Sequence, residues 1–562
     1  MHTELRTHQT TLRPPHGIRD IGRKNFHFYP HFYSLKMRFM KKVFLLTALR
    51  ASLMIAAIMA RVPIQAQTRA DSVYLPPFML PDATYYLPAP PDSSSYAFLD
   101  DIAQWQWSKT VPTKRLERAS RESLSMPESM RTVMAQVLEL DTIGVEQTPA
   151  LSRLLVKSFI TGAISTLTIK DQYKRKRPFM VMNEDPLGQY DNPESLRASG
   201  SYPSGHTASG WATALAFAEM WPALQDTILR RGFEFGENRI IVNAHWQSDV
   251  TAGYLCAAAA IARVHNTTDF DNDIQAARAE YAQLKGLPVS DGFPFPSEEA
   301  DEAQTTPQYD VPHGERFLND PVDTASARYM ADLMLYWSNK PIRYTERGDM
   351  ARTEAEYSVH MMQKVMGEAM NLDINDEATP AISALLSYVL DKASTAADRL
   401  KPIRFRKRPF VQLGEPSAVA GDEEKERGKS SFPSGHTNLG WSTALVMAEL
   451  ANDHQDEILR RGYEYGHNRL IVGYHWYTDI EATRQLASAL VARLHADPVF
   501  RQLMTAARAE YEGATSINQP QSIKQNEADA WYDLSGREIK AQYIGKGVYI
   551  HGGKKVVIPF GM

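Results

Sequence analysis

Two nearly identical seven-residue stretches constrain what this chain can fold into more than any other feature. Residues 201–207 read Ser-Tyr-Pro-Ser-Gly-His-Thr, and residues 431–437 read Ser-Phe-Pro-Ser-Gly-His-Thr. A Pro-Ser-Gly turn that enters a helix leaves backbone N–H groups without intrahelical partners, and such a helix start binds anions, phosphate above all. Each stretch therefore predicts an N-capped helix that brings a histidine, His206 or His436, to an anion site. One isolated copy could equally be a capped helix with a surface histidine.

The two stretches belong to a longer duplication. Companion motifs recur at an offset of 230 or 231 residues over most of the chain, which is far longer than a solenoid repeat. Helical patterns such as 150–173 and 381–400 recur in both halves, whereas alternating strand patterns are scarce. The sequence thus predicts an all-α protein with two tandem helical-bundle domains, followed by a short C-terminal β-rich tail.

Composition divides the rest of the chain. Residues 37–42 are rich in Lys and Arg, the run to residue 60 is mostly apolar, and Gln-Ala-Gln follows at 65–67, which is the order of a secretory signal peptide. Arg50 interrupts the apolar run, and we expect no later segment that crosses a bilayer. The predicted segments are a non-native upstream extension (1–36), a signal peptide (37–67), the first domain (68–285), a linker (286–315), the second domain (316–513), a second linker (514–526) and the β-type tail (527–562).

Charge and cysteine content exclude several classes of protein. A formal net charge of −4 gives no reason to expect nucleic acid or an anionic membrane as a partner. The single cysteine, Cys256, rules out an intramolecular disulfide, and a buried small apolar residue is the better interpretation than a reactive thiol.

A pair of cations precedes each Pro-Ser-Gly stretch. Lys170 and Arg177 are seven residues apart, as are Lys401 and Arg408, and each arginine is followed by proline. A separation of seven is close to two helical turns, so we expect both cations on one helix face, with the proline ending the helix. Lysine supplies a compact charge and arginine a planar fork that binds two phosphate oxygens. Taken alone, the basic run 174–177 could be a solvated face or a nucleic-acid patch.

A third cluster follows each stretch. It contains Asn238, Arg239, His245 and Asp249 in the first half, and its counterparts in the second half are Asn468, Arg469, His475 and Asp479. A histidine and an aspartate four residues apart would share a helix face, where the carboxylate fixes the imidazole tautomer and leaves the other nitrogen as a nucleophile. A lone pair of this kind is more often a structural hydrogen bond. Together, however, the three clusters describe a cation-lined site for phosphoryl transfer that requires neither metal nor cofactor.

The motifs Lys-x6-Arg-Pro, Pro-Ser-Gly-His and Arg-x5-His-x3-Asp resemble the signature of the type 2 phosphatidic acid phosphatase superfamily, and within it the bacterial class A non-specific acid phosphatases. The resemblance covers about 91–281 and 321–511. It implies an all-helical fold and a phosphohistidine intermediate. The catalytic residues that it implies are the nucleophiles His245 and His475, their partners Asp249 and Asp479, and the general acids His206 and His436. The phosphate-binding residues that it implies are Lys170, Arg177, Ser204, Gly205, Arg239, Lys401, Arg408, Ser434, Gly435 and Arg469.

The sequence departs from the family pattern at several positions, among them Asn243-Ala244 in the first half and Tyr477-Thr478 in the second. Asn238 and Asn468 stand where the family usually has serine, although asparagine can still form hydrogen bonds. The segments 179–202 and 410–432, between the first and second motifs, differ between the halves. We expect them to line the mouths of the two sites, so the sites are expected to prefer different esters.

The leading hypothesis is an exported acid phosphatase that acts on small phosphate monoesters at two active sites, with the two domains paired within the chain. The tail resembles the sorting modules of bacteria with a type IX secretion route, so we expect the periplasm, or the cell surface or medium if the tail is a sorting signal. The alternatives are a vanadium-dependent haloperoxidase, a lipid phosphate phosphatase, and a tandem in which one half is a non-catalytic scaffold.

Overall fold

The structure is a computed structural model that describes residues 72–124, 127–189, 193–287, 311–419, 421, 423–518 and four strand segments between 531 and 558. The predicted upstream extension and signal peptide lie outside the described residues, as do 288–310 of the first linker and 519–526 of the second. The described parts of the two helical halves belong to one compact unit.

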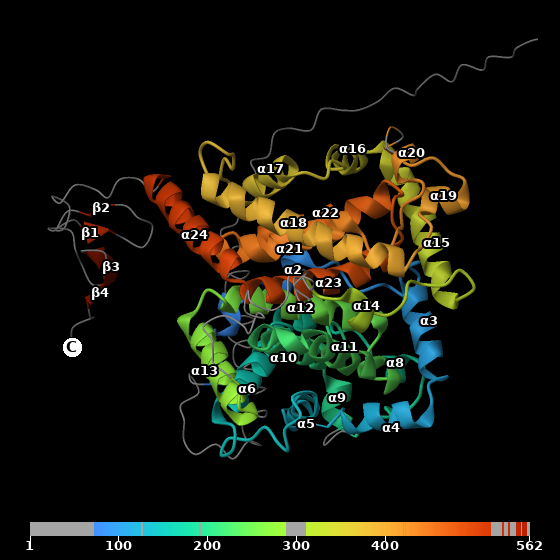
Figure 1. The fold of residues 1–562 in the computed structure, drawn as a ribbon, viewed down its shortest axis with the longest axis horizontal. Helices are drawn as coiled ribbons and strands as arrows, with labels where there is room; N and C mark the ends of the chain where they lie inside the picture. The colour runs from blue at the N-terminus through green and yellow to red at the C-terminus, as the bar shows by residue number, and fades with distance from the viewer. Residues whose placement is uncertain are drawn as a thin grey trace, which may run out of the picture. The chain divides into compact units, whose positions relative to one another are not determined.

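The first half is helical, as predicted (Figure 1). Short elements open it, namely η2 (Pro77–Met79) and α2 (Ala83–Tyr86). Its remaining helices are α3 (Phe98–Ser108), α4 (Thr113–Arg121), α5 (Glu128–Val137), α6 (Pro149–Ile164), α7 (Leu167–Tyr173), α8 (Pro178–Val181), α9 (Pro193–Ala198), α10 (Gly205–Met220), η3 (Pro222–Leu224), α11 (Gln225–Ile241), α12 (Gln247–Val264) and α13 (Thr268–Lys285).

The second half repeats this helical order. Its elements are α14 (Gly314–Phe317), α15 (Ala327–Asn339), η4 (Lys340–Tyr344), α16 (Glu346–Thr353), α17 (Val359–Met370), α18 (Pro380–Ile403), α19 (Pro409–Leu413), α20 (Glu423–Glu426), α21 (Gly435–Leu450), α22 (Gln455–Ile471), α23 (Tyr477–His495) and α24 (Pro498–Asn518). Helix α14 begins inside the predicted first linker, and α24 continues five residues beyond 513, so both predicted linkers are too long.

The tail carries four short strands, β1 (Trp531–Tyr532), β2 (Glu538–Ile539), β3 (Gly547–His551) and β4 (Lys554–Ile558). They form one antiparallel sheet in the order β2-β1-β3-β4. In its longest ladder, Tyr549 lies opposite Val556.

Two central helices, α10 and α21, lie in the core of their halves. From Thr207 to Met220 every residue of α10 is buried, and from Thr437 to Leu450 every residue of α21 is buried. Small residues bring the neighbouring helix close: a Cβ atom at Gly210 would lie 2.4 Å from the Phe235 ring of α11, and one at Gly440 would lie 2.5 Å from the Tyr465 ring of α22. This close approach places the start of the central helix beside the end of the next one, where the arginine of the third cluster lies.

The sequence predicts a helical segment over 150–173 and no membrane-length segment after the signal peptide. Residues Pro149–Val181 do have the length and hydropathy of a membrane span. However, this stretch is divided into α6, α7 and α8, and 78% of its apolar window is buried inside the fold. It has the burial of a core segment of a helical domain.

The two halves exchange equivalent contacts. The backbone N–H of Asp82, ahead of the first bundle, donates to the Asp456 carboxylate of the second half at 2.9 Å. The corresponding segment of the second half reaches back, and His313 pairs with Asp226 of the first half at 2.9 Å. Helix α10 contacts α23, and α12 contacts α21. Equivalent surfaces of the halves therefore meet reciprocally, as in a two-fold interface.

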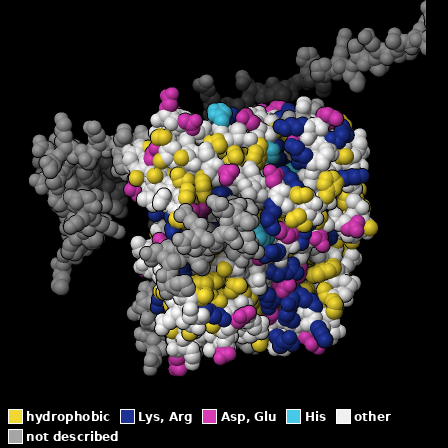
Figure 2. Space-filling view, viewed as in Figure 1, with side chains coloured by type: hydrophobic (Ala, Val, Ile, Leu, Met, Phe, Trp, Pro, Cys, Tyr) yellow, Lys and Arg dark blue, Asp and Glu magenta, His cyan; other side chains and the backbone are white. Residues whose placement is uncertain are grey.

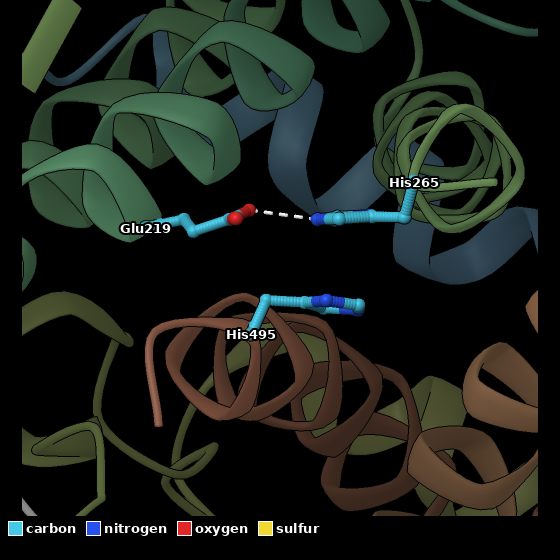
Figure 3. A group of neighbouring side chains, drawn as sticks. All are labelled: Glu219, His265 and His495. Carbon is cyan, nitrogen blue, oxygen red and sulfur yellow. Dashed lines mark hydrogen bonds and ion pairs between the residues drawn. The ribbon is translucent and has the colours of Figure 1, made fainter. Parts of the chain in front are cut away.

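A buried histidine pair lies on this pseudo-two-fold axis. The rings of His265 and His495 stack at a centroid distance of 3.5 Å, and they enter from opposite sides (Figure 3). His265 Nε2 lies 2.7 Å from a Glu219 oxygen, and His495 Nε2 lies 3.0 Å from a Glu449 oxygen. Each half thus contributes one buried histidine, next to its own glutamate, to the contact between the halves.

Candidate active sites

The repeated Pro-Ser-Gly stretch caps a helix in both halves, as predicted. Ser204 is the N-cap residue of α10, and its hydroxyl oxygen accepts hydrogen bonds from the Thr207 backbone N–H and hydroxyl at 3.3 and 2.9 Å. Ser434 makes the same two contacts with Thr437 at the start of α21. Both serines are fully buried, and the cap orients the helix start that carries the histidine.

The two cations of the first cluster do not share a helix, contrary to the sequence prediction. Helix α7 ends at Tyr173, and Lys174 adopts a left-handed backbone conformation with φ of 46°. Arg177 is the N-cap residue of α8, and Pro178 begins that helix rather than ending the previous one. Proline fits the first turn of a helix because its missing N–H has no intrahelical role there. Arg408 and Pro409 do the same at the start of α19.

In the first half, Lys170 nevertheless reaches the capped helix start, and Arg177 reaches the third cluster. Lys170 Nζ donates to the carbonyl of Gly200 at 2.9 Å and also to that of Pro203. Arg177 Nη1 lies 2.8 Å from His245 Nε2. In the second half, Arg408 Nη1 lies 3.0 Å from His475 Nε2. The loop between α7 and α8 therefore brings the two cations together at the site, which a shared helix face was expected to do.

The histidine and aspartate of the third cluster are also not on one helix face. His245 precedes α12, Trp246 is the N-cap residue, and Asp249 occupies the third helical position, where its carboxylate accepts from the Trp246 backbone N–H at 2.8 Å. The same carboxylate lies 3.5 Å from His245 Nδ1. Asp249 therefore holds the helix start and the imidazole together.

The second half orients its histidine with a slightly different partner. His475 Nδ1 donates to the Ser431 carbonyl at 2.6 Å, while the Ser431 hydroxyl donates to Asp479 at 2.5 Å. In both halves Nδ1 faces an acceptor and Nε2 faces an arginine. This fixes the tautomer that has its lone pair on Nε2.

Behind each aspartate lies a buried Asp–Arg–Asp group that the sequence analysis did not find. Arg175 bridges Asp249 and Asp101, both at 2.7 Å, and Arg406 bridges Asp479 and Asp332 at 2.5 and 2.7 Å. Asp101 and Asp332 also accept from the first turn of the following helix, at the backbone N–H of Ser248 and Thr478. The sequence signal for this buried group is that Arg175 recurs as Arg406 within the two basic runs.

Burial and neighbouring cations set the protonation of the first site. Burial and the Arg177 charge lower the pKa of His245 to about 3, so its imidazole is neutral. Burial and the Arg239 charge likewise lower the pKa of His206 well below its usual value. Burial opposes ionisation of Asp249, but the Arg175 charge holds the pKa of this carboxyl below its usual range. Burial, with the Arg177 charge, lowers the pKa of Lys170 to about 7.

The two asparagines that depart from the family pattern are part of a buried network. Asn238 Nδ2 donates to Glu122 at 2.6 Å, and Asn468 Nδ2 donates to Glu354 at 2.6 Å. The neighbouring arginines are held close by: Arg239 Nη2 donates to the Ser123 hydroxyl at 2.8 Å, and Arg469 Nη2 to the Glu354 carbonyl at 3.1 Å. The amide thus tethers the segment that positions the neighbouring arginine, Arg239 or Arg469.

A cavity of about 530 Å³ opens at the second site. The predicted site residues that line it are Lys401, Arg408, Gly435, His436, Arg469 and His475. His436 Nε2 lies 2.9 Å from the Ala355 carbonyl, and its ring is flanked by Tyr357 and Tyr465. Ser434 and Asp479 are fully buried behind this lining. The volume is sufficient for a small organic phosphate.

Among the residues that the structure describes, one group of side chains outside the two sites could hold a metal. Glu219, His265 and His495 bring their ligand atoms within 4.8 Å of one another. Each imidazole Nε2 faces its own glutamate, and the ion pair between Glu219 and His265 already uses two of the three ligand atoms. Elsewhere on the surface, Lys and Arg side chains gather along one side of the face in Figure 2, interspersed with acidic ones.

Comparison with known proteins identifies both halves. The model of the PAP2 superfamily matches residues 151–273 and again residues 380–502. A non-specific acid phosphatase of Providencia stuartii is 35% identical over 195 residues, which are 34% of this chain and 79% of that protein. An acid phosphatase of Zymomonas mobilis is 33% identical, over 37% of this chain and 79% of its own length. A non-specific acid phosphatase of Salmonella typhimurium is 32% identical, over 40% of this chain and 92% of its own length.

Each matched region contains one complete set of the three motifs, and the similar acid phosphatases are the length of about one half. The chain therefore belongs to the PAP2 superfamily, and it carries the family's domain twice in tandem.

Proposed function

We propose that this protein is an exported acid phosphatase that hydrolyses small phosphate monoesters through a phosphohistidine intermediate, at one active site in each half. The observation that carries the proposal is the orientation of His245 and His475. In each, Nδ1 faces an oxygen acceptor and Nε2 lies against an arginine, at 2.8 Å for His245 and 3.0 Å for His475. An arginine that binds a phosphoryl oxygen at this place would hold the phosphorus next to the nucleophilic nitrogen.

In the proposed reaction His245 Nε2 attacks phosphorus, and the bond from phosphorus to the ester oxygen breaks. His206 donates its proton to the leaving oxygen, and a water molecule then hydrolyses the phosphohistidine. Lys170, Arg177 and Arg239 neutralise the charge on the phosphoryl oxygens. Because burial and these cations lower the pKa of free His206, the protonated acid is expected only when the dianionic substrate is bound.

The same charges support catalysis without a metal. In the first half, side chains of the protein serve as nucleophile, general acid and neutralising cations, and their counterparts do the same in the second half. Vanadate, which adopts a five-coordinate geometry like the transition state, should inhibit hydrolysis.

The alternative function of a vanadium-dependent haloperoxidase would instead show halide-dependent peroxidase activity after vanadate loading.

The two domains are proposed to pair as a covalent counterpart of a dimer. The reciprocal contacts of Asp82 with Asp456 and of His313 with Asp226 support this, as do the stacked His265 and His495. Fusion raises the effective concentration of the partners, so the interface need not be strong. Export is proposed from the signal-like segment 37–67, which lies outside the described residues.

The mechanism can be tested with a ³²P-labelled aryl phosphate. After acid-free alkaline quenching, we expect label on His245 and His475, with hydrolysis unchanged by a chelator such as EDTA. Loss of turnover with EDTA that a divalent ion restores would contradict the metal-independent mechanism. Label on serine or aspartate would contradict the histidine nucleophiles.

A further inference from the structure

The mouths of the two sites differ in charge at three equivalent positions. Where the first half has Ser195, Leu196 and Ser199, the second half has Lys425, Glu426 and Lys429. All three second-half side chains line the cavity that also contains His436, Arg408 and His475. A serine and a leucine cannot supply charge, so the second site has two cations and one carboxylate that the first site lacks at these positions.

Glu426 joins two of the cations. Its Oε2 lies 2.8 Å from Arg408 Nη2, and its Oε1 lies 2.8 Å from Lys429 Nζ. Arg408 is the arginine whose other terminal nitrogen contacts the nucleophile His475. A phosphoryl group bound by the whole Arg408 fork would therefore meet the Glu426 carboxylate, and like charges at such a distance repel.

At the two positions that correspond to Glu426 and Lys429, the equivalent arginine of the first half meets neutral groups. Arg177 Nε donates to the Leu196 carbonyl at 2.8 Å, and Arg177 Nη2 donates to the Ser199 hydroxyl at 2.9 Å. A hydroxyl and a carbonyl impose no charge repulsion on an incoming phosphate. Both arginines thus meet the same two chain positions, which carry neutral side chains in the first half and the charged Glu426 and Lys429 in the second.

The other carboxylates of the second cavity have partners of their own. Asp398 pairs with Lys401 at 2.8 Å, and Glu356 accepts from the Ser358 hydroxyl at 2.7 Å. Lys425 lies on the exposed rim, and the side chain of Lys429 is 48% exposed. If Glu426 is displaced, Arg408 becomes available to the phosphoryl group. Lys429, with Lys425 nearby, becomes available to another anion.

We propose that the second site selects phosphate monoesters that carry a second anionic group, such as a carboxylate or another phosphate, and that Glu426 and Lys429 set this selectivity. This rests on the proposed phosphatase function. A substrate with two anionic groups supplies partners for both cations that Glu426 holds, so it can displace the carboxylate. A substrate with only the phosphoryl group leaves Lys429 without its partner once Glu426 moves, and it binds more weakly.

The test uses the full chain with one site silenced and two matched esters, 4-carboxyphenyl phosphate and its uncharged analogue 4-carbamoylphenyl phosphate. The readout is the ratio of kcat/KM for the charged ester to that for the uncharged ester. In His245→Ala, where only the second site works, we expect a ratio of about three to ten, which falls at high salt. In His475→Ala, where only the first site works, we expect a ratio near one.

Variants at the mouth then assign the effect. In the His245→Ala background, Lys429→Ser and Glu426→Leu, which install the first-half residues, should each bring the ratio towards one. Lys429→Ser should do so by slowing the charged ester, and Glu426→Leu by speeding the uncharged one. Lys364→Ser, an exposed lysine on α17, is the matched control and should leave the ratio as it is.

Equal ratios in the two silenced proteins, or a ratio that Lys429→Ser does not change, would overturn this selectivity while leaving the phosphatase function intact. If neither silenced protein hydrolysed either ester, although circular dichroism showed both folded, the phosphatase function itself would fail.

Discussion

The two halves of this chain keep the same buried Asp–Arg–Asp group and differ at the mouth of the site. In the interior, Arg175 and Arg406 bridge equivalent aspartates, and each proposed nucleophile, His245 or His475, lies between an acceptor and an arginine. At the mouth, Leu196 is replaced by Glu426. Buried charge networks tolerate little change because the loss of one partner leaves an uncompensated charge, whereas exposed positions can change without that penalty. We therefore expect the halves to share the proposed chemistry and to differ in substrate preference.

The largest effect is expected from removing a bridging arginine. Arg406→Met leaves the buried carboxylates of Asp479 and Asp332 without their common partner, and Arg175→Met does the same to Asp249 and Asp101. Each change should lower the free energy of unfolding by about 3–5 kcal/mol. Denaturant melts of both variants, with exposed Lys407→Met as the control, measure this loss. A loss of stability in only one of the two arginine variants would contradict the equivalence of the two buried Asp–Arg–Asp groups.

The contact between the halves should depend on pH. Burial opposes protonation of His265, but the Glu219 charge dominates and raises its pKa to about 9. The pKa of Glu219 is lowered: burial opposes its ionisation, but the His265 charge outweighs this. Glu449, Asp271 and His495 also face the pair. A raised histidine pKa gives stability that is complete below about 6.5 and is lost as the pH rises through about 9.

A lowered glutamate pKa gives stability that is present above the usual value near 4.5 and is lost in stronger acid. The Glu–His pair should therefore stabilise the protein most between about pH 4.5 and 6.5. Removal of the pair with His265→Gln should cost roughly 1–3 kcal/mol in that window and much less at pH 9.5. Thermal melts of both proteins at pH 5.5 and 9.5 give the difference; an equal cost at both pH values would mean that His265 is neutral in the fold.

The smallest effect concerns product binding at the second site. Because Glu426 competes for Arg408, Glu426→Leu in the His245→Ala background should lower the inhibition constant for inorganic phosphate about three- to tenfold, or about 1 kcal/mol. Glu424→Leu is the matched control, because its side chain is 92% exposed and pairs only with Arg427 among the ion pairs described. If Glu426→Leu leaves the inhibition constant unchanged, the charge difference between the mouths does not determine the affinity for phosphate.

Much of this arrangement follows from the sequence, and the parts that do not have physical causes. The repeated motifs identified the helical fold, the capped helix starts and the cavity-lining cations, because capping and phosphate binding depend on local residue types. Lys170 and Arg177 do not share the predicted helix face, nor do His245 and Asp249, because residue spacing does not reveal the turn that interrupts a helix. Asp101 and Asp332 were missed because they lie more than 70 residues from the arginines that they bind. Such long-range pairs have no local pattern.

The central claim is that the halves are two separate active sites that use the same chemistry. The direct measurement is the amount of phosphohistidine and the rate of hydrolysis of 4-carbamoylphenyl phosphate in His245→Ala, His475→Ala and the double variant. We predict that each single variant loses one of two phosphohistidines and only that half's share of turnover, and that the double variant is inactive. Complete loss of hydrolysis in either single variant, with the protein folded, would contradict this account and make the other half a scaffold.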